Sequence, residues 1–165
     1  MKLTSQEEYG LRCLLRVGRS DEGSSVTIPE LARAEGISEP NVAKMMRILR
    51  RGGFVTSTRG QSGGYTLSRP AERIIVGHVV AVLGGRLYEP AFCEGHAGVE
   101  VSCTHMPDCS IRSVWGMVQQ AVDQVLGKIT LKDLLRTEPE MDAWSKGRTP
   151  TLPTYSPRAG RADRL

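Results

Sequence analysis

The sequence has no run of about 18 apolar residues, the length that a membrane-spanning helix needs, so a transmembrane protein is excluded. Residues 1–8 lack an apolar core of signal-peptide length and are acidic where such a segment is basic. These absences predict a protein without a membrane partner that stays in the cytoplasm, where paired disulfides are rare. The sequence also has no nucleophile–base arrangement, no phosphate-binding glycine loop followed by lysine, and no HExxH motif. We therefore do not expect an enzyme.

The charge is distributed unevenly along the 165 residues, a length that fits one domain or a small domain with an extension. Residues 1–75 hold 12 basic and 8 acidic side chains, residues 76–144 hold 5 and 9, and residues 145–165 hold 5 and 1. Five bases fall within sixteen residues without an acid among them: Lys44, Arg47, Arg50, Arg51 and Arg59. This cluster is typical of a nucleic-acid-binding surface, and a solvated helix face is the alternative.

Cap and turn signals organise the first half of the chain. A capping box from Thr4 to Glu7 opens the first helix, and a proline follows each of the caps Thr27 and Ser38 within two residues. The signals predict helices over 4–18, 27–36 and 38–52 and short strands over 54–58 and 65–67. The fold class is therefore mainly α with a small β-hairpin. It is a winged helix-turn-helix over residues 1–75 with a long dimerisation helix further on.

The winged helix predicts a surface for double-stranded promoter DNA. In this motif the third helix enters the major groove, and the hairpin lies over the backbone or the minor groove. Glu39 can accept a hydrogen bond from cytosine and Asn41 can pair with adenine, while the basic side chains neutralise phosphates. The predicted DNA contacts are Thr27, Ser38, Glu39, Asn41, Lys44, Arg47, Arg51, Arg59, Gly63 and Gly64. For the two glycines, a purely structural role in the hairpin turn is the alternative.

The second half predicts a dimer. A helix over residues 111–126 carries a continuous apolar stripe that includes Val114, Trp115 and Val118. Such a stripe is too apolar to be exposed on a monomer, so we expect a homodimer through this helix, which matches the two-fold symmetry of most operators. Residues 76–136 form a second predicted unit, which combines a loop poor in periodicity with the dimerisation helix. Residues 137–165 are rich in proline, threonine, serine and arginine and are predicted to be a disordered basic tail.

Three of the four cysteines lie in the least periodic stretch of the chain. Cys93, Cys103 and Cys109 are separated by nine and five residues, whereas Cys13 is expected to be a buried, inert thiol. The spacing is not a pair of CxxC units, so a zinc ribbon is a poor fit. Three thiolates in one irregular loop are suited to an iron–sulfur cluster that lacks one protein ligand. Zinc with His96 or His105 and a thiol redox switch remain the alternatives.

Several motifs resemble the IscR/NsrR/RirA (BadM-type) family of bacterial winged-helix regulators over residues 1–136. They are Met1-Lys2-Leu3-Thr4 with Tyr9 and Leu11, the runs 28–32 and 59–65, the three cysteines ahead of Trp115, and Ile129-Thr130-Leu131. The resemblance implies homodimers that bind DNA, and a cluster on three cysteines that controls promoter binding. Members of the family commonly have five residues in both cysteine gaps, so the first gap is longer here.

The resemblance also concerns the fourth cluster ligand. IscR-like proteins use a histidine three residues after the last cysteine, where this chain has Arg112, which cannot serve. NsrR-like proteins use a carboxylate of the first helix, and the matching residue is Glu8. The implied cofactor is a [4Fe–4S] rather than a [2Fe–2S] cluster, and its ligands are Cys93, Cys103, Cys109 and Glu8 of the partner subunit. The alternative for Glu8 is a surface ion pair with Arg12, and His96 and His105 are reserve ligands.

The sequence thus predicts a homodimeric transcription regulator, a repressor, whose operator binding depends on an iron–sulfur cluster. The cluster senses nitric oxide, iron or redox status. The alternative regulator has no cluster and uses Cys93, Cys103 and Cys109 as a thiol redox switch or a zinc site.

Overall fold

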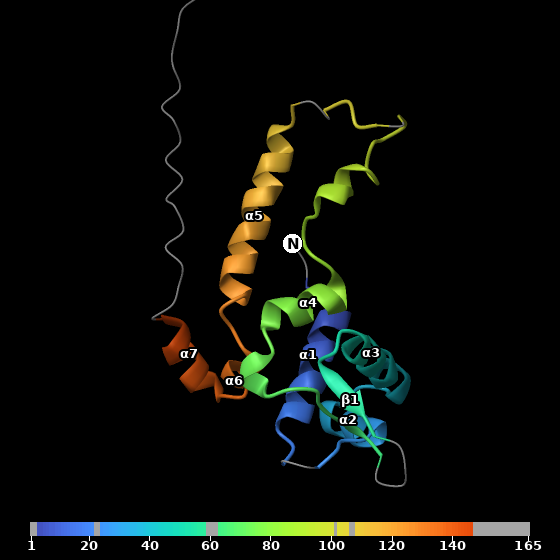
Figure 1. The fold of residues 1–165 in the computed structure, drawn as a ribbon, viewed down its shortest axis with the longest axis vertical. Coiled ribbons are helices and arrows are strands. Elements are labelled where there is room, and N and C mark those ends of the chain that lie inside the picture. The colour runs from blue at the N-terminus through green and yellow to red at the C-terminus, as the bar shows by residue number, and fades with distance from the viewer. Residues whose placement is uncertain (1–2, 22–23, 59–62, 101, 106–107, 147–165) are drawn as a thin grey trace, which may run out of the picture.

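The computed structural model describes residues 3–21, 24–58, 63–100, 102–105 and 108–146. Its helices and strands follow one another along the chain (Figure 1): α1 (Ser5–Gly18), α2 (Ile28–Glu35), α3 (Glu39–Arg51), β1 (Val55–Ser57), β2 (Tyr65–Leu67), η1 (Ala71–Arg73), α4 (Val76–Gly84), η2 (Pro90–Cys93), α5 (Ser110–Leu126), α6 (Leu131–Leu134) and α7 (Glu138–Lys146). The predicted fold class, mainly helical with one small antiparallel hairpin, is confirmed.

The predicted capping box at Thr4 and the predicted cap at Thr27 both form, and Thr27 also belongs to a reciprocal capping box. The backbone N–H of Thr4 donates to the Glu7 carboxylate at 2.8 Å, and the N–H of Thr27 donates to Glu30 at the same distance. Each cap satisfies backbone donors that have no partner within the helix. Gly36 ends α2 with a φ of 64°, a left-handed conformation that glycine adopts without strain. The turn between α2 and α3 is therefore specified by local sequence.

The hairpin is tied to the segment that precedes α2. Strands β1 and β2 pair antiparallel with Val55 opposite Leu67, and Val26 forms a bridge with Tyr65. Gly64 is buried at this junction, where an added Cβ would lie 2.8 Å from the Ser25 hydroxyl and 2.9 Å from the Val26 carbonyl oxygen. Only a glycine lets the two segments approach this closely. Packing within the protein therefore accounts for Gly64.

One core joins the winged helix to the helices that follow it. Leu14 of α1 and Met46 of α3 are fully buried, and Leu83 of α4 and Leu131 of α6 belong to the same cluster. Cys13 lies in this core with no exposed surface, as expected of an inert thiol. Residues beyond 75 therefore help to hold the DNA-binding motif together, because they bury apolar surface against it.

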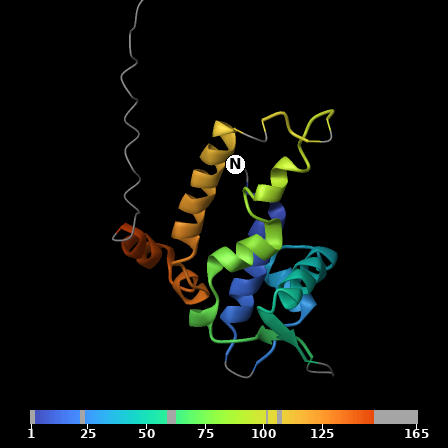
Figure 2. The ribbon, with the colours of Figure 1, turned by 45° about the horizontal axis from the view of Figure 1, so that its top comes forward.

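We call residues 86–109 the cysteine arm. Helix α5 and the described residues of the cysteine arm project together from this core (Figures 1 and 2). The side chain of Gln119 on α5 accepts a hydrogen bond from the Tyr88 N–H at 2.9 Å, and Arg86 forms an ion pair with Asp123. Within the chain, large apolar side chains of α5 stay uncovered: Ile111, Val114, Trp115, Met117 and Val125. The predicted apolar stripe is thus present and partly open to solvent.

The prediction of disorder from residue 137 onward is wrong for residues 138–146, which form α7. The N–H and hydroxyl of Thr137 both donate to the Glu140 carboxylate at 2.8 Å, so this helix also begins with hydrogen bonds to its cap. Residues 147–165 lie outside the described part of the chain. None of the described helices is long and apolar enough to span a membrane.

Candidate nucleic-acid interface and metal centre

The beginning of α3 presents polar side chains to solvent. Ser38 occupies the N-cap position, as predicted, although its side chain makes no cap hydrogen bond. Ser38, Glu39 and Asn41 are all exposed, and their side chains are of the kind that contacts base edges in the major groove. Thr27 differs, since its hydroxyl donates to Glu30 at 2.8 Å and is already engaged in the cap of α2.

Three basic side chains of α3 have no ion-pair partner among the described residues. Lys44, Arg47 and Arg51 are exposed, and within the described residues none of them forms an ion pair. Uncompensated cations on one helix are suited to a polyanion such as DNA. Arg50, which was not among the predicted contacts, donates to the Ser57 hydroxyl at 3.2 Å and so ties β1 to α3.

The predicted residues of the hairpin tip are only partly visible. Arg59 lies outside the described residues, Gly63 is half-buried and Gly64 is buried. The structure therefore brings the predicted α3 residues to one exposed helix but does not place Gly64 at the surface.

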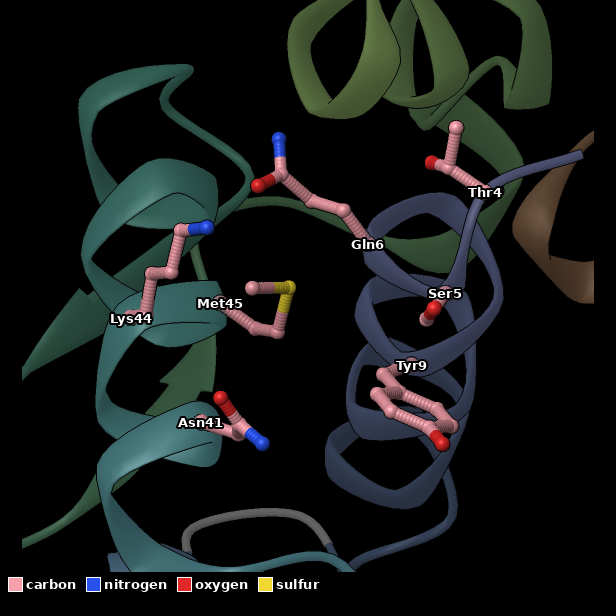
Figure 3. A pocket seen from close by; sticks show the side chains of 7 residues that line it. All are labelled: Thr4, Ser5, Gln6, Tyr9, Asn41, Lys44 and Met45. Atoms are coloured by element: carbon pink, nitrogen blue, oxygen red, sulfur yellow. The ribbon is translucent and has the colours of Figure 1, made fainter.

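A cleft of about 360 Å³ opens between α1 and α3 (Figure 3). It is lined by Thr4, Ser5, Gln6 and Tyr9 of α1 and by Asn41, Lys44 and Met45 of α3. Two of these, Asn41 and Lys44, belong to the predicted DNA contacts, whereas none of the α1 residues does. No local signal could have found the α1 residues, because the packing of α1 against α3 creates the cleft.

The three clustered cysteines occupy different positions around the cysteine arm. Cys93 ends η2, Cys103 lies in the following loop, and Cys109 is the N-cap residue of α5; all are free and half-buried. The Tyr88 hydroxyl lies 3.8 Å from the sulfur of Cys93. Burial, the contact with Cys93 and the charge of Cys109 together raise the pKa of Tyr88 above its ordinary value. Of the three thiols, Cys93 is therefore the one in contact with Tyr88.

These donors are not assembled into a complete ligand set. Among the described residues, no three His, Cys, Asp or Glu side chains form a group that could hold a metal ion. His96 is engaged, with Nδ1 2.8 Å from the Phe92 carbonyl oxygen and its ring stacked on Phe92. Three free thiols on one arm are nevertheless the donor type that an iron–sulfur cluster takes. The donor chemistry fits such a cluster, and the described residues do not bring a fourth ligand to these thiols.

Glu8 is exposed on α1. Its alternative role, an ion pair with Arg12, is not formed, because Arg12 pairs with Glu35 of α2 at 3.1 Å. The Glu8 carboxylate is thus available to a group outside its own helix.

Gln119 is a residue of the site that sequence reasoning missed. It is buried, it accepts from Tyr88, and it donates to Asp123 at 2.9 Å. A single amide thus connects the backbone of the cysteine arm to α5. No local signal distinguishes it from Gln120 and Gln124 of the same helix, because only the packing of the cysteine arm against α5 buries Gln119 and gives it partners.

The raised pKa of Cys13 predicts selective thiol labelling. Burial raises the pKa of this thiol to about 11, so at pH 8 only about one molecule in a thousand carries the thiolate. In reduced, metal-free protein, a disulfide reagent at pH 8 is expected to titrate three thiols in the folded state and four in denaturant. Cys13→Ala is the control, because it should lower only the second count. Fast reaction of all four thiols in the folded protein would contradict this prediction.

A helix-turn-helix, an unneutralised basic α3 and an adjoining hairpin define a winged-helix transcription regulator. The sequence profile of the Rrf2 family, described as iron-dependent transcriptional regulators, matches residues 3–137. The chain belongs to the Rrf2 family. Its function is therefore DNA-binding regulation of transcription and not enzymatic catalysis.

Relatives and solved structures agree with this assignment. The chain is 38% identical over 136 residues to protein rrf2 of Nitratidesulfovibrio vulgaris strain Hildenborough, covering 82% of this chain and 88% of the relative. The structure of T. potens IscR is 30% identical with a TM-score of 0.63, covering 82% and 86%. The structure of CymR, described as the global cysteine regulator of B. subtilis, is 27% identical with a TM-score of 0.63, covering 82% and 96%. The resemblance found in the sequence is confirmed at the level of the family.

Proposed function

We propose that this protein is a homodimeric repressor whose affinity for operator DNA is controlled by an iron–sulfur cluster. The cluster is a [4Fe–4S] cluster held by Cys93, Cys103, Cys109 and Glu8 of the partner subunit. The protein acts in the cytoplasm, where it reports nitric oxide, iron supply or redox state to a promoter. The DNA is bound by α3 through Ser38, Glu39, Asn41, Lys44, Arg47 and Arg51, and by Arg59, which follows β1 in the sequence, while Thr27, Gly63 and Gly64 have supporting structural positions.

The observation that carries the proposal is the presence of three free, half-buried thiols on one arm, with Cys93 in contact with the Tyr88 hydroxyl. When bound, an iron–sulfur cluster supplies iron whose ligation responds to small oxidising or nitrosylating molecules and to iron supply. The description of the family as iron-dependent regulators supports a metal over a purely organic switch.

Glu8 supports the sensing role through its chemistry and its position. A carboxylate is a harder ligand than a thiolate and is displaced more easily from iron. Glu8 is exposed on α1, and within the described residues no three-ligand group includes it. A ligand supplied by the partner would therefore link the cysteine arm of one subunit to the DNA-binding unit of the other.

The contacts around α4 and α5 offer a route from the cluster to DNA. The Gln6 side chain of α1 donates to the Leu83 carbonyl at the end of α4, and Gln119 of α5 holds the cysteine arm that follows. Rearrangement of the arm would alter how the two copies of α3 are spaced. Coupling between two sites is typically worth about 5- to 150-fold in affinity, which is enough to release an operator.

A second candidate uses the thiols without iron. The Tyr88 hydroxyl contacts Cys93, and the solved neighbour CymR is described as a cysteine regulator. In this version, two of the three thiols pass two electrons and two protons to an oxidant and form a disulfide. A zinc site on the same cysteines is its metal-bound variant.

Anaerobic purification tests the proposal. We expect a brown protein with visible absorption, about one cluster per subunit, and operator affinity that changes 5- to 150-fold on chelation or on exposure to nitric oxide. A colourless, iron-free protein that binds its operator equally well before and after chelation would contradict cluster control. A change that requires an oxidant and is reversed by a reductant would instead favour the thiol switch.

A further inference from the structure

We propose that the cleft between α1 and α3 binds one phosphate group of the DNA backbone. The inference rests on the proposed function. It adds α1 to a DNA interface that otherwise consists of α3 and the hairpin. The cleft is lined from α1 by Ser5 and Tyr9 and from α3 by Asn41 and Lys44, and its volume is about 360 Å³ (Figure 3).

The donors that line the cleft suit an anion. Lys44 supplies an exposed ammonium group, Ser5 and Tyr9 supply hydroxyls, and Asn41 supplies an amide. Hydroxyls, amides and lysines are the groups that most often contact DNA phosphates, and such contacts fix how a protein lies on the duplex. No carboxylate is among the side chains that line the cleft.

The neighbouring acid is directed elsewhere. The Glu7 carboxylate accepts from the Thr4 N–H at 2.8 Å and from the Thr4 hydroxyl at 2.7 Å. It also packs against α4, because a Cβ added to Gly84 would lie 2.4 Å from the carboxyl carbon of Glu7. The negative charge of Glu7 is therefore held by the cap on the α4 side of α1 and does not fill the cleft.

Tyr9 is held in place by α2. The Arg12 guanidinium lies 5.9 Å from the centre of the Tyr9 ring. Arg12 in turn forms an ion pair with Glu35 at 3.1 Å and donates to the Glu35 backbone carbonyl. A ring that packs against a fixed guanidinium is pre-organised, so little conformational freedom is lost when its hydroxyl binds a ligand.

The position of the cleft gives the phosphate a specific task. Asn41 belongs both to the cleft and to the exposed face of α3 that we assign to base recognition. A phosphate bound in the cleft would therefore fix the depth and register of α3 in the major groove. The contact itself carries no sequence information.

Salt dependence separates this contact from general electrostatics. Lys44→Gln is expected to lower the slope of log affinity against log salt by about one, the amount for one phosphate contact. Lys128→Gln removes the same charge from the exposed turn after α5 and is expected to leave the slope unchanged. Equal slopes for Lys44→Gln and the wild type would overturn the assignment of Lys44 to a phosphate.

Hydroxyl deletion tests the new α1 residues. Tyr9→Phe keeps the ring that packs on Arg12, and we expect it to weaken binding about tenfold on operator and unrelated duplex alike, because it removes one hydrogen bond to a charged group. Ser5→Ala is expected to act in the same direction, while Ser113→Ala, an exposed serine of α5, leaves affinity unchanged. Unchanged melting temperatures will show that all these variants fold.

A neutral phosphate analogue makes the test decisive. Single methylphosphonates are placed at successive positions of the operator. At the position of the phosphate that binds in the cleft, Tyr9→Phe is expected to cause no further loss of affinity. If Tyr9→Phe and Ser5→Ala bind as the wild type does, or if their defect persists with every methylphosphonate, the cleft is not a phosphate site. Either result leaves the proposed function intact, whereas failure of the wild type to bind DNA at all would reject the function itself.

Discussion

The variant Val114→Glu is expected to be monomeric and to bind operator DNA about 100-fold or more weakly than the wild type. Val114 lies on α5 with 47% of its surface exposed, and Ile111 beside it is 60% exposed. If a second copy covers this stripe, two-fold symmetry places each substitution in the interface twice. Burying an unpaired carboxylate costs several kcal/mol, and a symmetric interface would bear this cost twice. Sedimentation velocity gives the oligomeric state, and fluorescence anisotropy gives the operator affinity.

The matched control is Gln120→Glu, which introduces the same charge change on the same helix. Gln120 is exposed and, from the helical repeat, lies on the side of α5 away from the apolar stripe. We expect this variant to remain a dimer with wild-type affinity. If Val114→Glu is also a dimer, α5 is not the interface. A monomer that keeps full operator affinity would separate dimerisation from DNA binding.

Local structure could be predicted wherever four or five consecutive residues determine it. The caps at Thr4 and Thr27 and the turn at Gly36 depend only on their immediate neighbours, and all three form as predicted. The extent of α5 was also predictable, because its apolar stripe repeats over 17 residues. Ser38 shows the limit of such signals, since the residue type and position were right but the hydrogen bond is absent.

The missed helix α7 shows how composition can mask a local signal. Thr137-Glu138-Pro139-Glu140 has the same cap, proline and acid as Thr27-Ile28-Pro29-Glu30, which was interpreted correctly. The surrounding residues are rich in proline, serine and arginine, and this average favoured disorder for the whole segment. A capping box acts over one turn, so the polar composition of the flanking residues does not cancel it.

The contacts that assemble the two candidate sites could not be predicted. Tyr88 and Gln119 are 31 residues apart, and the side chain of Gln6 meets Leu83 across 77 residues. Sequence spacing identified the cysteines but could not indicate that the Tyr88 hydroxyl contacts Cys93. The cleft at Tyr9 likewise exists only because hydrophobic burial packs α1 against α3. The hydrophobic effect is non-directional, so the sequence alone does not tell which residues of the two helices will face each other.

Replacing any one of Cys93, Cys103 or Cys109 with serine is expected to abolish the visible absorption of the anaerobic protein. The operator affinity should shift about 5- to 150-fold, to the value of chelated wild type. The reason is that a serine hydroxyl is a poor substitute for thiolate in an iron–sulfur site, so each of the three positions is required. Absorption spectra, iron and sulfide analysis, and anisotropy under nitrogen are the measurements.

The pattern across variants distinguishes the cluster from its alternatives. Cys13→Ala is the control, because Cys13 is buried in the core and away from the arm, and it should retain the absorption. A disulfide switch requires only two cysteines, so one of the three serine variants would respond normally to oxidant. A zinc site would give colourless protein with stoichiometric zinc. Full absorption in all three variants would refute the assigned ligands.

Mixing variants tests whether Glu8 comes from the partner subunit. Glu8→Ala and Cys103→Ser are each expected to give colourless homodimers, because each lacks one ligand at both sites. In a heterodimer of the two, one site combines intact cysteines with an intact Glu8 across the interface. Random exchange of subunits should therefore restore about a quarter of the wild-type absorption. No recovery would place Glu8 in the same subunit as its cysteines, and a coloured Glu8→Ala homodimer would remove Glu8 from the ligand set.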